Sequence, residues 1–260
     1  TDVDHFHYFK NKKTNGAILL ALKSFAGPID GFTENSRGTL GVAERNAILN
    51  LDGGQYSTGE PSGKKPIVIL LPGIMGSALG NSNGLVWINY LKFLTGGLSH
   101  LSLEKEIKDP NAIIRTSYQR LGEALSGEYD VVTFAFDWRL SLEKEAGKFN
   151  DKILKWMKLN QPIKIIGHSM GGVLVRDFMV FHPNTWNELN SSKDFRLLFL
   201  GSPLRGSFRI NNVLFGEDDI INKLSKIDIV HSKRKLLKMF ITFPGLLCLL
   251  PFNTDPGNDF

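Results

Sequence analysis

Cysteine is nearly absent from this chain of 260 residues, since Cys248 is the only one. A single cysteine excludes an internal disulfide framework and a metal site built from several cysteines. A long hydrophobic run is missing as well. The nearest candidate, residues 239–252, is shorter than the roughly 18 apolar residues that cross a bilayer, and Pro244 and Pro251 interrupt it. No nucleotide-binding glycine loop, metal-ligand cluster or basic nucleic-acid stripe is visible, so we expect no cofactor, no metal and no nucleic-acid partner.

Positively charged residues are in small excess, with 31 Lys and Arg against 26 Asp and Glu. The resulting net charge of +5 is typical of a solvated surface, although it would also favour anionic headgroups. A hydrophobic content of 42% fits a soluble globular protein, and the length suffices for one domain with a sizeable core. We expect a soluble protein, with peripheral membrane contact as an alternative, and the composition does not indicate a compartment. Because the sequence begins at Thr1 rather than Met, we also expect it to be part of a longer polypeptide.

The chain has two regions that differ in composition and in hydrophobic pattern. Residues 1–60 are largely polar and rich in turn-forming residues, which predicts an irregular lead-in or linker with one short helix over 17–25. Residues 61–260 alternate continuous apolar runs with amphipathic stretches. The apolar runs predict buried strands over 67–71, 131–136, 163–166 and 196–200. Helical spacing predicts helices over 118–125 and 142–159. This alternation predicts an α/β fold with a mostly parallel sheet flanked by helices.

The segment Gly167–Gly171, with the sequence GHSMG, follows the third apolar run and precedes a helical stretch that ends near Phe181. Strand, sharp turn and helix in this order are typical of a nucleophile elbow, which raises a serine hydroxyl above the end of a sheet. Glycines two positions before and after the serine are expected, because strand and helix backbones come too close there for a Cβ. We therefore predict that Ser169 is a catalytic nucleophile, and a structural glycine-rich turn is the alternative.

The loop after the first strand, residues 72–77, has the sequence PGIMGS. In this architecture that loop supplies one backbone N–H of the oxyanion hole, and the residue after the nucleophile supplies the other. We assign these two roles to Ile74 and Met170. A plain glycine turn between a strand and the next element is the alternative for the loop.

Several motifs occur in a fixed order: LPGIMGS at 71–77, VW at 86–87, FDWR at 136–139, GHSMGG at 167–172, GSPLRGS at 201–207 and the apolar stretch 243–251. Together they resemble the lecithin:cholesterol acyltransferase family of α/β-hydrolases, which includes lysosomal phospholipase A2 and phospholipid:diacylglycerol acyltransferases. The resemblance implies an α/β-hydrolase fold over residues 61–260, with a lid-like segment at about 204–243. It also implies a serine lipid esterase or O-acyltransferase that forms an acyl-enzyme at Ser169 on a phospholipid or acylglycerol ester.

Three further residues are candidate substrate or lid contacts. Trp87 resembles the tryptophan near the acyl pocket of the family, and a surface-loop aromatic is the alternative. Asp137 and Arg139 follow a predicted strand, at the edge where active-site loops form. For this pair the alternative is a structural ion pair with Trp138 packed beneath it. A basic cluster, formed by Lys233, Arg234, Lys235 and Lys238, precedes the apolar residues 239–252. It predicts either an interfacial membrane contact or a solvated helix face.

A serine nucleophile needs a histidine base oriented by a carboxylate, and in this fold both follow the serine along the chain. His182 is too far along the helix predicted after Ser169, at roughly 20 Å. His231 lies beside Asp228 in the lid-like segment rather than after a late strand. For His168 we expect packing or a backbone hydrogen bond, because the elbow directs it away from the serine.

The family pattern implies that the acid and base lie on later strands, so we expect the given sequence to end before them. Two other functions stay open. One is a small-ester hydrolase of another α/β-hydrolase branch, and the other is a non-catalytic hydrolase-fold binding module.

Overall fold

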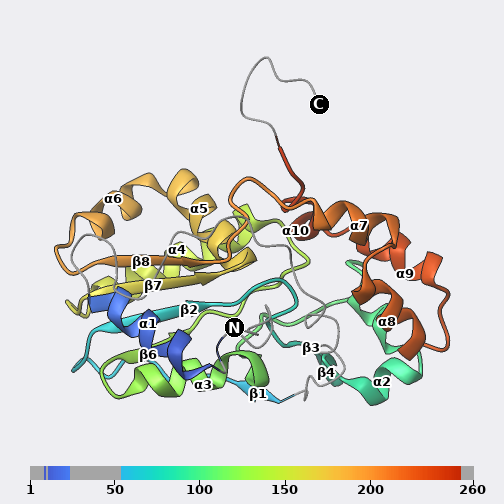
Figure 1. Cartoon of the computed structure of the whole chain (residues 1–260), viewed down its shortest axis with the longest axis horizontal. Coiled ribbons are helices and arrows are strands. Elements are labelled where there is room, and N and C mark those ends of the chain that lie inside the picture. The colour runs from blue at the N-terminus through green and yellow to red at the C-terminus, as the bar shows by residue number, and fades with distance from the viewer. Residues whose placement is uncertain (1–8, 10, 24–53, 253–260) are drawn as a thin grey trace.

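The structure is a computed structural model that describes residue 9 and residues 11–23 and 54–252. Four parallel strands form its central sheet, in the spatial order β6-β2-β7-β8 (Figure 1). These strands are β2 (Ile67–Leu71), β6 (Asp130–Thr133), β7 (Ile163–His168) and β8 (Arg196–Leu200). All residues of β2 and β7 are buried, as expected for strands that are covered on both faces. The predicted parallel sheet is confirmed.

One of the four predicted strands is shorter than expected. The apolar run 131–136 forms a strand only as far as Thr133. Beyond it the chain leaves the sheet, and the Phe136 N–H donates to the Ser77 hydroxyl at 3.0 Å. An apolar run therefore marks burial here, but tertiary hydrogen bonds decide where the strand ends.

One face of the sheet is covered by α1 (Lys12–Lys23) and α3 (Arg115–Ser126). Ile18 and Leu22, four residues apart on α1, are buried in the same cluster as Val68 and Leu70 of β2. The short helix predicted over residues 17–25 is present, but it begins earlier, at Lys12, and ends at Lys23. It packs on the sheet because a helix with one apolar stripe buries that stripe. Residues 24–53 of the predicted linker lie outside the described residues.

The opposite face is covered by α4 (Leu142–Met157), α5 (Met170–Phe181) and α6 (Pro183–Ser191) (Figure 1). Phe149 of α4 and Phe178 of α5 meet edge to face, with ring centroids 5.2 Å apart. They belong to the cluster that contains Ile67 and Ile69 of β2. Successive side chains of β2 thus point to opposite faces, and the strand is the centre of a three-layer α/β fold.

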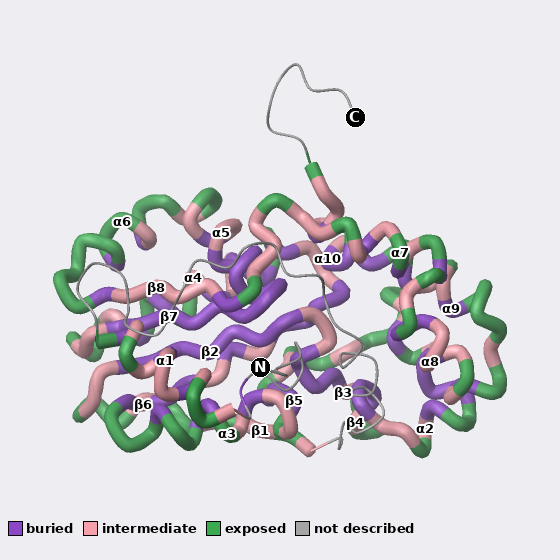
Figure 2. Tube along the Cα trace, viewed as in Figure 1, coloured by how far each residue is buried: buried purple, intermediate pink, exposed green. Residues whose placement is uncertain are grey.

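Shorter elements gather beside the carboxyl ends of the strands (Figure 1). They are β3 (Leu79–Asn81), β4 (Gly84–Trp87), α2 (Tyr90–Leu94), η4 (Gly97–Leu101), α7 (Arg209–Phe215), α8 (Asp219–Ile227), α9 (Lys233–Phe240) and α10 (Pro244–Leu247). A two-stranded pair, β1 (Gln55–Tyr56) with β5 (Ile113–Ile114), completes the described elements. Figure 2 shows the central strands β2 and β7 buried, the edge strand β8 mostly intermediate, and the outer faces of α7–α9 exposed. Within the described ranges, no helix is long and apolar enough to cross a membrane.

Candidate active site

Ser169 lies at the turn between β7 and α5, with φ 51° and ψ −120°. A positive φ is uncommon for a residue with a side chain, and such strain gathers at functional turns. The turn has the form of a nucleophile elbow, with a buried strand before the serine and a helix directly after it. This conformation supports Ser169 as the nucleophile, a role that stays a prediction.

Two glycines of the elbow are required by close approach. A Cβ on Gly171 would lie 2.6 Å from the backbone oxygen of Pro72, and one on Gly167 would lie 2.7 Å from the Cα of Gly172. Both distances are shorter than Cβ contacts in real proteins. The expected glycine requirement before and after Ser169 is therefore confirmed.

The loop after β2 lies directly beside this elbow. Strands β2 and β7 pair in parallel with Leu71 opposite Gly167, so both chains leave the sheet at neighbouring points. A Cβ added at Gly73 would lie 3.0 Å from the Cβ of Ser169. A tight turn follows, in which the Gly76 N–H donates to the Gly73 carbonyl at 2.9 Å and Met75 has φ 59°. The register of the sheet thus places the PGIMGS loop against Ser169.

Ile74 and Met170, the predicted oxyanion donors, occupy these two turns. Ile74 is the residue after Gly73, and it lines the cavity beside Ser169. Met170 is the first residue of α5, a position where helical N–H groups have no intrahelical partner. In the described part of the chain, neither N–H donates to a backbone carbonyl. Both groups are therefore available to an oxyanion, and their role stays a prediction.

Trp87 holds the turn at Gly73–Gly76 through a hydrogen bond to Met75. Its indole Nε1 donates to the carbonyl of Met75 at 2.8 Å, and its ring meets the Trp138 ring edge to face at 5.5 Å. The side chain is only 1% exposed and lines the cavity. The alternative of a surface-loop aromatic is therefore wrong, and Trp87 remains a candidate substrate contact.

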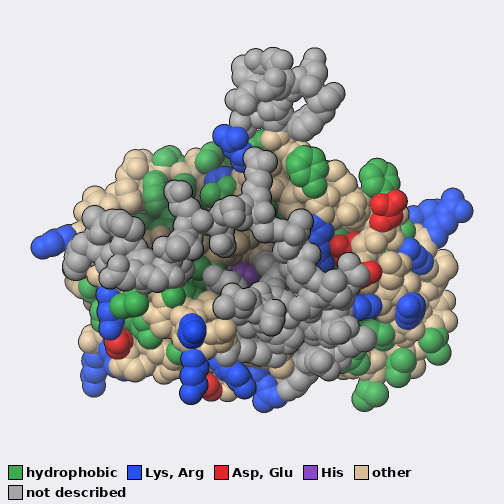
Figure 3. Space-filling model, in the orientation of Figure 1, with side chains coloured by type: hydrophobic (Ala, Val, Ile, Leu, Met, Phe, Trp, Pro, Cys, Tyr) green, Lys and Arg blue, Asp and Glu red, His purple; other side chains and the backbone are tan. Residues whose placement is uncertain are grey.

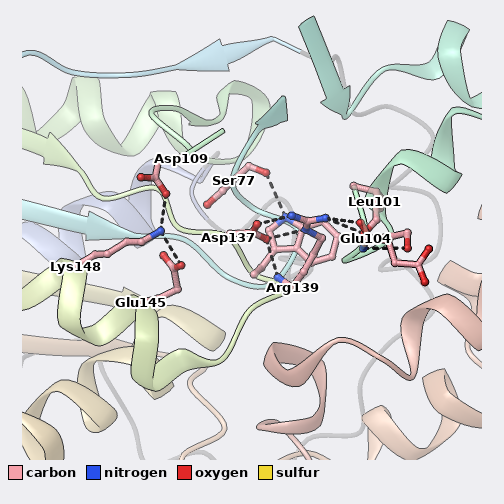
Figure 4. A network of polar contacts seen from close by, with 10 residues as sticks. Ser77, Leu101, Glu104, Asp109, Asp137, Arg139, Glu145 and Lys148 are labelled. Carbon is pink, nitrogen blue, oxygen red and sulfur yellow. Dashed lines mark hydrogen bonds and ion pairs between the residues drawn. The ribbon is translucent and has the colours of Figure 1, made fainter. Parts of the chain in front are cut away.

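Asp137 and Arg139 form a buried ion pair instead of lining the cavity (Figure 4). The Arg139 guanidinium donates through Nη2 to Oδ2 of Asp137 at 2.6 Å and through Nε to Oδ1 at 2.9 Å. Its Nη1 donates to the Leu101 carbonyl at 2.9 Å, which joins the pair to η4. Both residues are 3% exposed. The structural ion pair that was the alternative is thus present, and neither side chain lines the cavity. A substrate or lid contact of this pair stays a prediction.

The FDWR and PGIMGS motifs hold each other in place. Ser77, at the end of the loop, is fully buried, and its hydroxyl accepts the N–H of Phe136 at 3.0 Å. The indole of Trp138 donates to the Ser77 carbonyl at 3.4 Å. The carbonyl of Arg139 accepts the N–H of Gly245 in α10 at 3.1 Å. The turn after β6 thus holds the PGIMGS loop through these hydrogen bonds.

A second buried carboxylate lies near this turn (Figure 4). Glu145 of α4 is 1% exposed and lies 3.1 Å from the ammonium of Lys148, which also contacts Asp109 at 2.5 Å. Burial raises the pKa of Glu145 above its usual range, while the neighbouring Lys148 acts in the opposite direction. Lys148 therefore offsets the cost of burying this carboxylate.

His168 and Tyr118 form a contact that the sequence did not reveal. The Nδ1 of His168 lies 2.9 Å from the Tyr118 hydroxyl, which also accepts the N–H of Gly73 at 2.8 Å. Burial raises the pKa of Tyr118 well above its usual range. The packing expected for His168 is present, since its ring meets that of Phe9 edge to face at 5.1 Å. The hydrogen bond to Tyr118 of α3 adds a side-chain partner that was not predicted. Tyr118 gave no local signal beyond its place in the predicted helix.

A cavity of about 350 Å³ lies beside Ser169. Its walls are mostly apolar, and Figure 3 shows a histidine side chain at the bottom of a hollow on this face. The volume is in the range of small-molecule sites. The predicted lid-like segment, 204–243, folds as α7–α9 and supplies part of the wall through Ile210, Val213, Ile220, Phe240 and Phe243. Aromatic side chains from other parts of the chain, Phe9, Trp87 and Trp138, complete it.

The other histidines that were considered lie away from the nucleophile. His182 follows the end of α5 and stacks on Phe178 at 6.1 Å, and His231 pairs with Asp228 at 3.0 Å; neither lines the cavity. Across the described ranges, the hydroxyl of Ser169 has no hydrogen bond to a histidine. That the acid and base follow later in the chain stays a prediction. No group of three or more His, Cys, Asp or Glu among the described residues could hold a metal ion.

Comparison with known proteins links the chain to one family. A family model described as lecithin:cholesterol acyltransferase matches residues 116–256, which is more than half of the sequence. No curated protein matches. Among solved structures, the mature form of the Bacillus licheniformis lipase BlEst2 is similar, with a TM-score of 0.36 and 14% identity over 75% of this chain and 69% of the lipase. A TM-score this low does not support an inference about function.

Proposed function

Because this chain belongs to the lecithin:cholesterol acyltransferase family, we propose that it is a lipid esterase or O-acyltransferase that forms an acyl-enzyme at Ser169. One observation carries this proposal. Ser169, the serine of the GHSMG motif, has a positive φ of 51°. It lies against both the PGIMGS loop and an apolar cavity. A strained serine at the end of a parallel strand is where an α/β-hydrolase exposes its nucleophile.

The reaction begins when Oγ of Ser169 attacks the carbonyl carbon of an ester. A histidine base takes the hydroxyl proton as the Oγ–C bond forms. The carbonyl oxygen becomes an oxyanion, which accepts the N–H groups of Ile74 and Met170. Loss of one such donor typically costs about 3–4 kcal/mol in the transition state. The C–O bond of the ester then breaks, and the leaving alkoxide takes the proton from the histidine.

The acyl-enzyme is resolved by the reverse sequence, with water or an alcohol as the second nucleophile. Water yields a free fatty acid, and an alcohol yields a new ester. The apolar cavity is suited to an acyl chain, with Trp87 as a candidate contact on its wall. We therefore propose a lipid or other long-chain ester as the substrate.

Exposed apolar side chains on the lid-like segment support transient contact with a membrane surface. Phe208, Phe215 and Ile229 are 69%, 77% and 78% exposed. The basic cluster defined above, Lys233, Arg234, Lys235 and Lys238, lies within α9, which begins four residues after Ile229. Apolar and basic residues together are typical of a surface that binds anionic lipid. This contact would bring the cavity close to its substrate.

A non-catalytic binding module is the second candidate. It is favoured by one observation, which is that no histidine in the described part of the chain reaches the Ser169 hydroxyl. Such a module would use the apolar cavity to bind a lipid without cleaving it. A small-ester hydrolase is the remaining alternative within the enzymes.

Labelling with a fluorophosphonate probe tests the proposal. We expect the unmodified protein to gain the probe mass on Ser169, because an elbow serine with oxyanion donors attacks phosphorus as it attacks an ester carbonyl. Ser169→Ala should lose the label. Ser207→Ala is the matched control, since Ser207 lines the same cavity and should leave labelling intact.

Two outcomes would contradict the proposal. Labelling that persists in Ser169→Ala would exclude Ser169 as the nucleophile. A protein that resists labelling but binds a fluorescent fatty acid would favour the binding module. With an active protein, p-nitrophenyl esters of increasing acyl length distinguish a lipid esterase, which prefers long chains, from a small-ester hydrolase.

A further inference from the structure

Three segments that are distant in the sequence meet at one hydroxyl group. Tyr118 projects from α3, Gly73 lies in the loop after β2, and His168 is the last residue of β7. The Tyr118 oxygen is 2.8 Å from the Gly73 nitrogen and 2.9 Å from Nδ1 of His168. Each partner directly precedes a residue of the proposed machinery, because Ile74 follows Gly73 and Ser169 follows His168.

The Tyr118 hydroxyl can serve both partners. A backbone N–H only donates, so the Tyr118 oxygen accepts from Gly73. The direction of its second bond is set by the His168 tautomer. When the ring proton lies on Nε2, the hydroxyl donates to Nδ1 and acts as acceptor and donor together.

The surroundings keep this hydroxyl protonated and dry. Tyr118 is 4% exposed and His168 is 7% exposed. The ring of Phe9 covers the pair, with centroids 5.5 Å from Tyr118 and 5.1 Å from His168. Because burial raises the pKa of Tyr118, the phenol stays neutral and can donate. Hydrogen bonds shielded from water in this way hold their geometry more firmly than exposed ones.

We propose that Tyr118 is a positioning residue, whose hydroxyl fixes the distance between the Ile74 N–H and the Ser169 nucleophile by joining Gly73 to His168. This inference rests on the proposed function. The sheet alone sets where both loops leave, through the pairing of Leu71 with Gly167. Beyond that pair the two loops stay in close approach, since a Cβ on Gly73 would lie 3.0 Å from the Cβ of Ser169. The Tyr118 hydroxyl adds hydrogen bonds that join Gly73 to His168 across this contact.

Tyr118→Phe is the direct test, because it removes the hydroxyl and keeps the ring that packs against Phe9. Tyr129→Phe is the matched control: Tyr129 is also buried, at 5% exposure, but it lines a smaller cavity with Lys164 and Asp194, away from Ser169. With a p-nitrophenyl ester, we expect kcat of Tyr118→Phe to fall about 10- to 100-fold while KM changes little, because a misplaced donor acts on the transition state. Tyr129→Phe should keep both constants.

A second measurement does not depend on turnover. Hydrogen–deuterium exchange of peptides spanning residues 72–76 should become faster in Tyr118→Phe, since the Gly73 N–H loses its acceptor, while exchange in α5 stays unchanged. His168→Asn is a further variant, because its amide oxygen can accept near the position of Nδ1, and it should retain more activity than His168→Ala.

The outcomes separate the two proposals. If Ser169→Ala removes activity while Tyr118→Phe matches Tyr129→Phe in kcat and in exchange, the positioning role is wrong and the proposed function stands. If Ser169→Ala retains full activity, the proposed function is wrong. In that case local exchange at residues 72–76 still decides whether Tyr118 holds the loop, and an unchanged rate would overturn the inference.

Discussion

Replacing Arg139 by Met should strongly destabilise this protein, although the side chain does not touch the cavity. Arg139 is 3% exposed and makes two bonds to Asp137, of 2.6 and 2.9 Å. Methionine has a similar length but cannot donate. The substitution therefore leaves a buried carboxylate without its counter-charge, and the Leu101 carbonyl without the donor that it has at 2.9 Å.

The size of the effect follows from the burial. Breaking a buried ion pair by removing one partner typically costs about 3–5 kcal/mol, because the remaining charge stays desolvated. For a chain of this size each kcal/mol lowers the melting temperature by about 2–4 °C. We therefore expect a fall of roughly 6–20 °C in Arg139→Met. Arg205→Met is the matched control, since Arg205 is exposed and should change stability by less than about 0.5 kcal/mol.

Urea unfolding followed by circular dichroism measures these differences. The double variant Asp137→Asn, Arg139→Met should recover part of the loss, because it removes the uncompensated charge and leaves only a neutral amide. Two results would refute this reasoning. One is an Arg139→Met protein within about 1 kcal/mol of the unmodified chain. The other is a double variant that is no more stable than the single one.

Two further predictions concern the elbow and a buried carboxylate. Gly171→Ala should lower the urea midpoint clearly, because its Cβ would lie 2.6 Å from the Pro72 oxygen. Gly127→Ala is the control and should be neutral or slightly stabilising, because Gly127 has open space around it and helical φ and ψ. Equal midpoints for the two variants would contradict this reasoning. Burial raises the pKa of Glu145, so its contribution to stability is present below the unfolded pKa and is lost as pH rises through the folded value. Glu145→Gln should therefore flatten the fall of the urea midpoint as the pH rises above the usual pKa of a glutamate side chain, and parallel curves for the two proteins would show the reasoning to be wrong.

Local patterns predicted the frame of the site. The run IVILL gave β2 with the predicted bounds, Ile67–Leu71, because a strand buried on both faces has no polar positions. The GHSMG motif likewise gave the turn at Ser169 and the start of α5 at Met170. Such features depend on neighbours in the sequence, which a pattern can show.

Contacts between distant segments were beyond the sequence. Tyr118 lies 45 positions from Gly73 and 50 from His168, and no spacing rule connects them. Asp137 and Arg139 were recognised as a pair, but whether the pair faces the cavity or the interior depends on η4, which supplies the Leu101 carbonyl. In both cases the deciding partner comes from another element of the fold.

The position of β2 has a consequence for how this protein can be divided. The strand lies between β6 and β7 in the sheet, yet it precedes the segment 116–256 that matches the family. An excised segment with those limits would leave β6 without its neighbour, expose one edge of β7 and lose the turn that faces Ser169. The matched segment is therefore not an autonomous folding unit, and a minimal fragment for expression has to begin before Ile67.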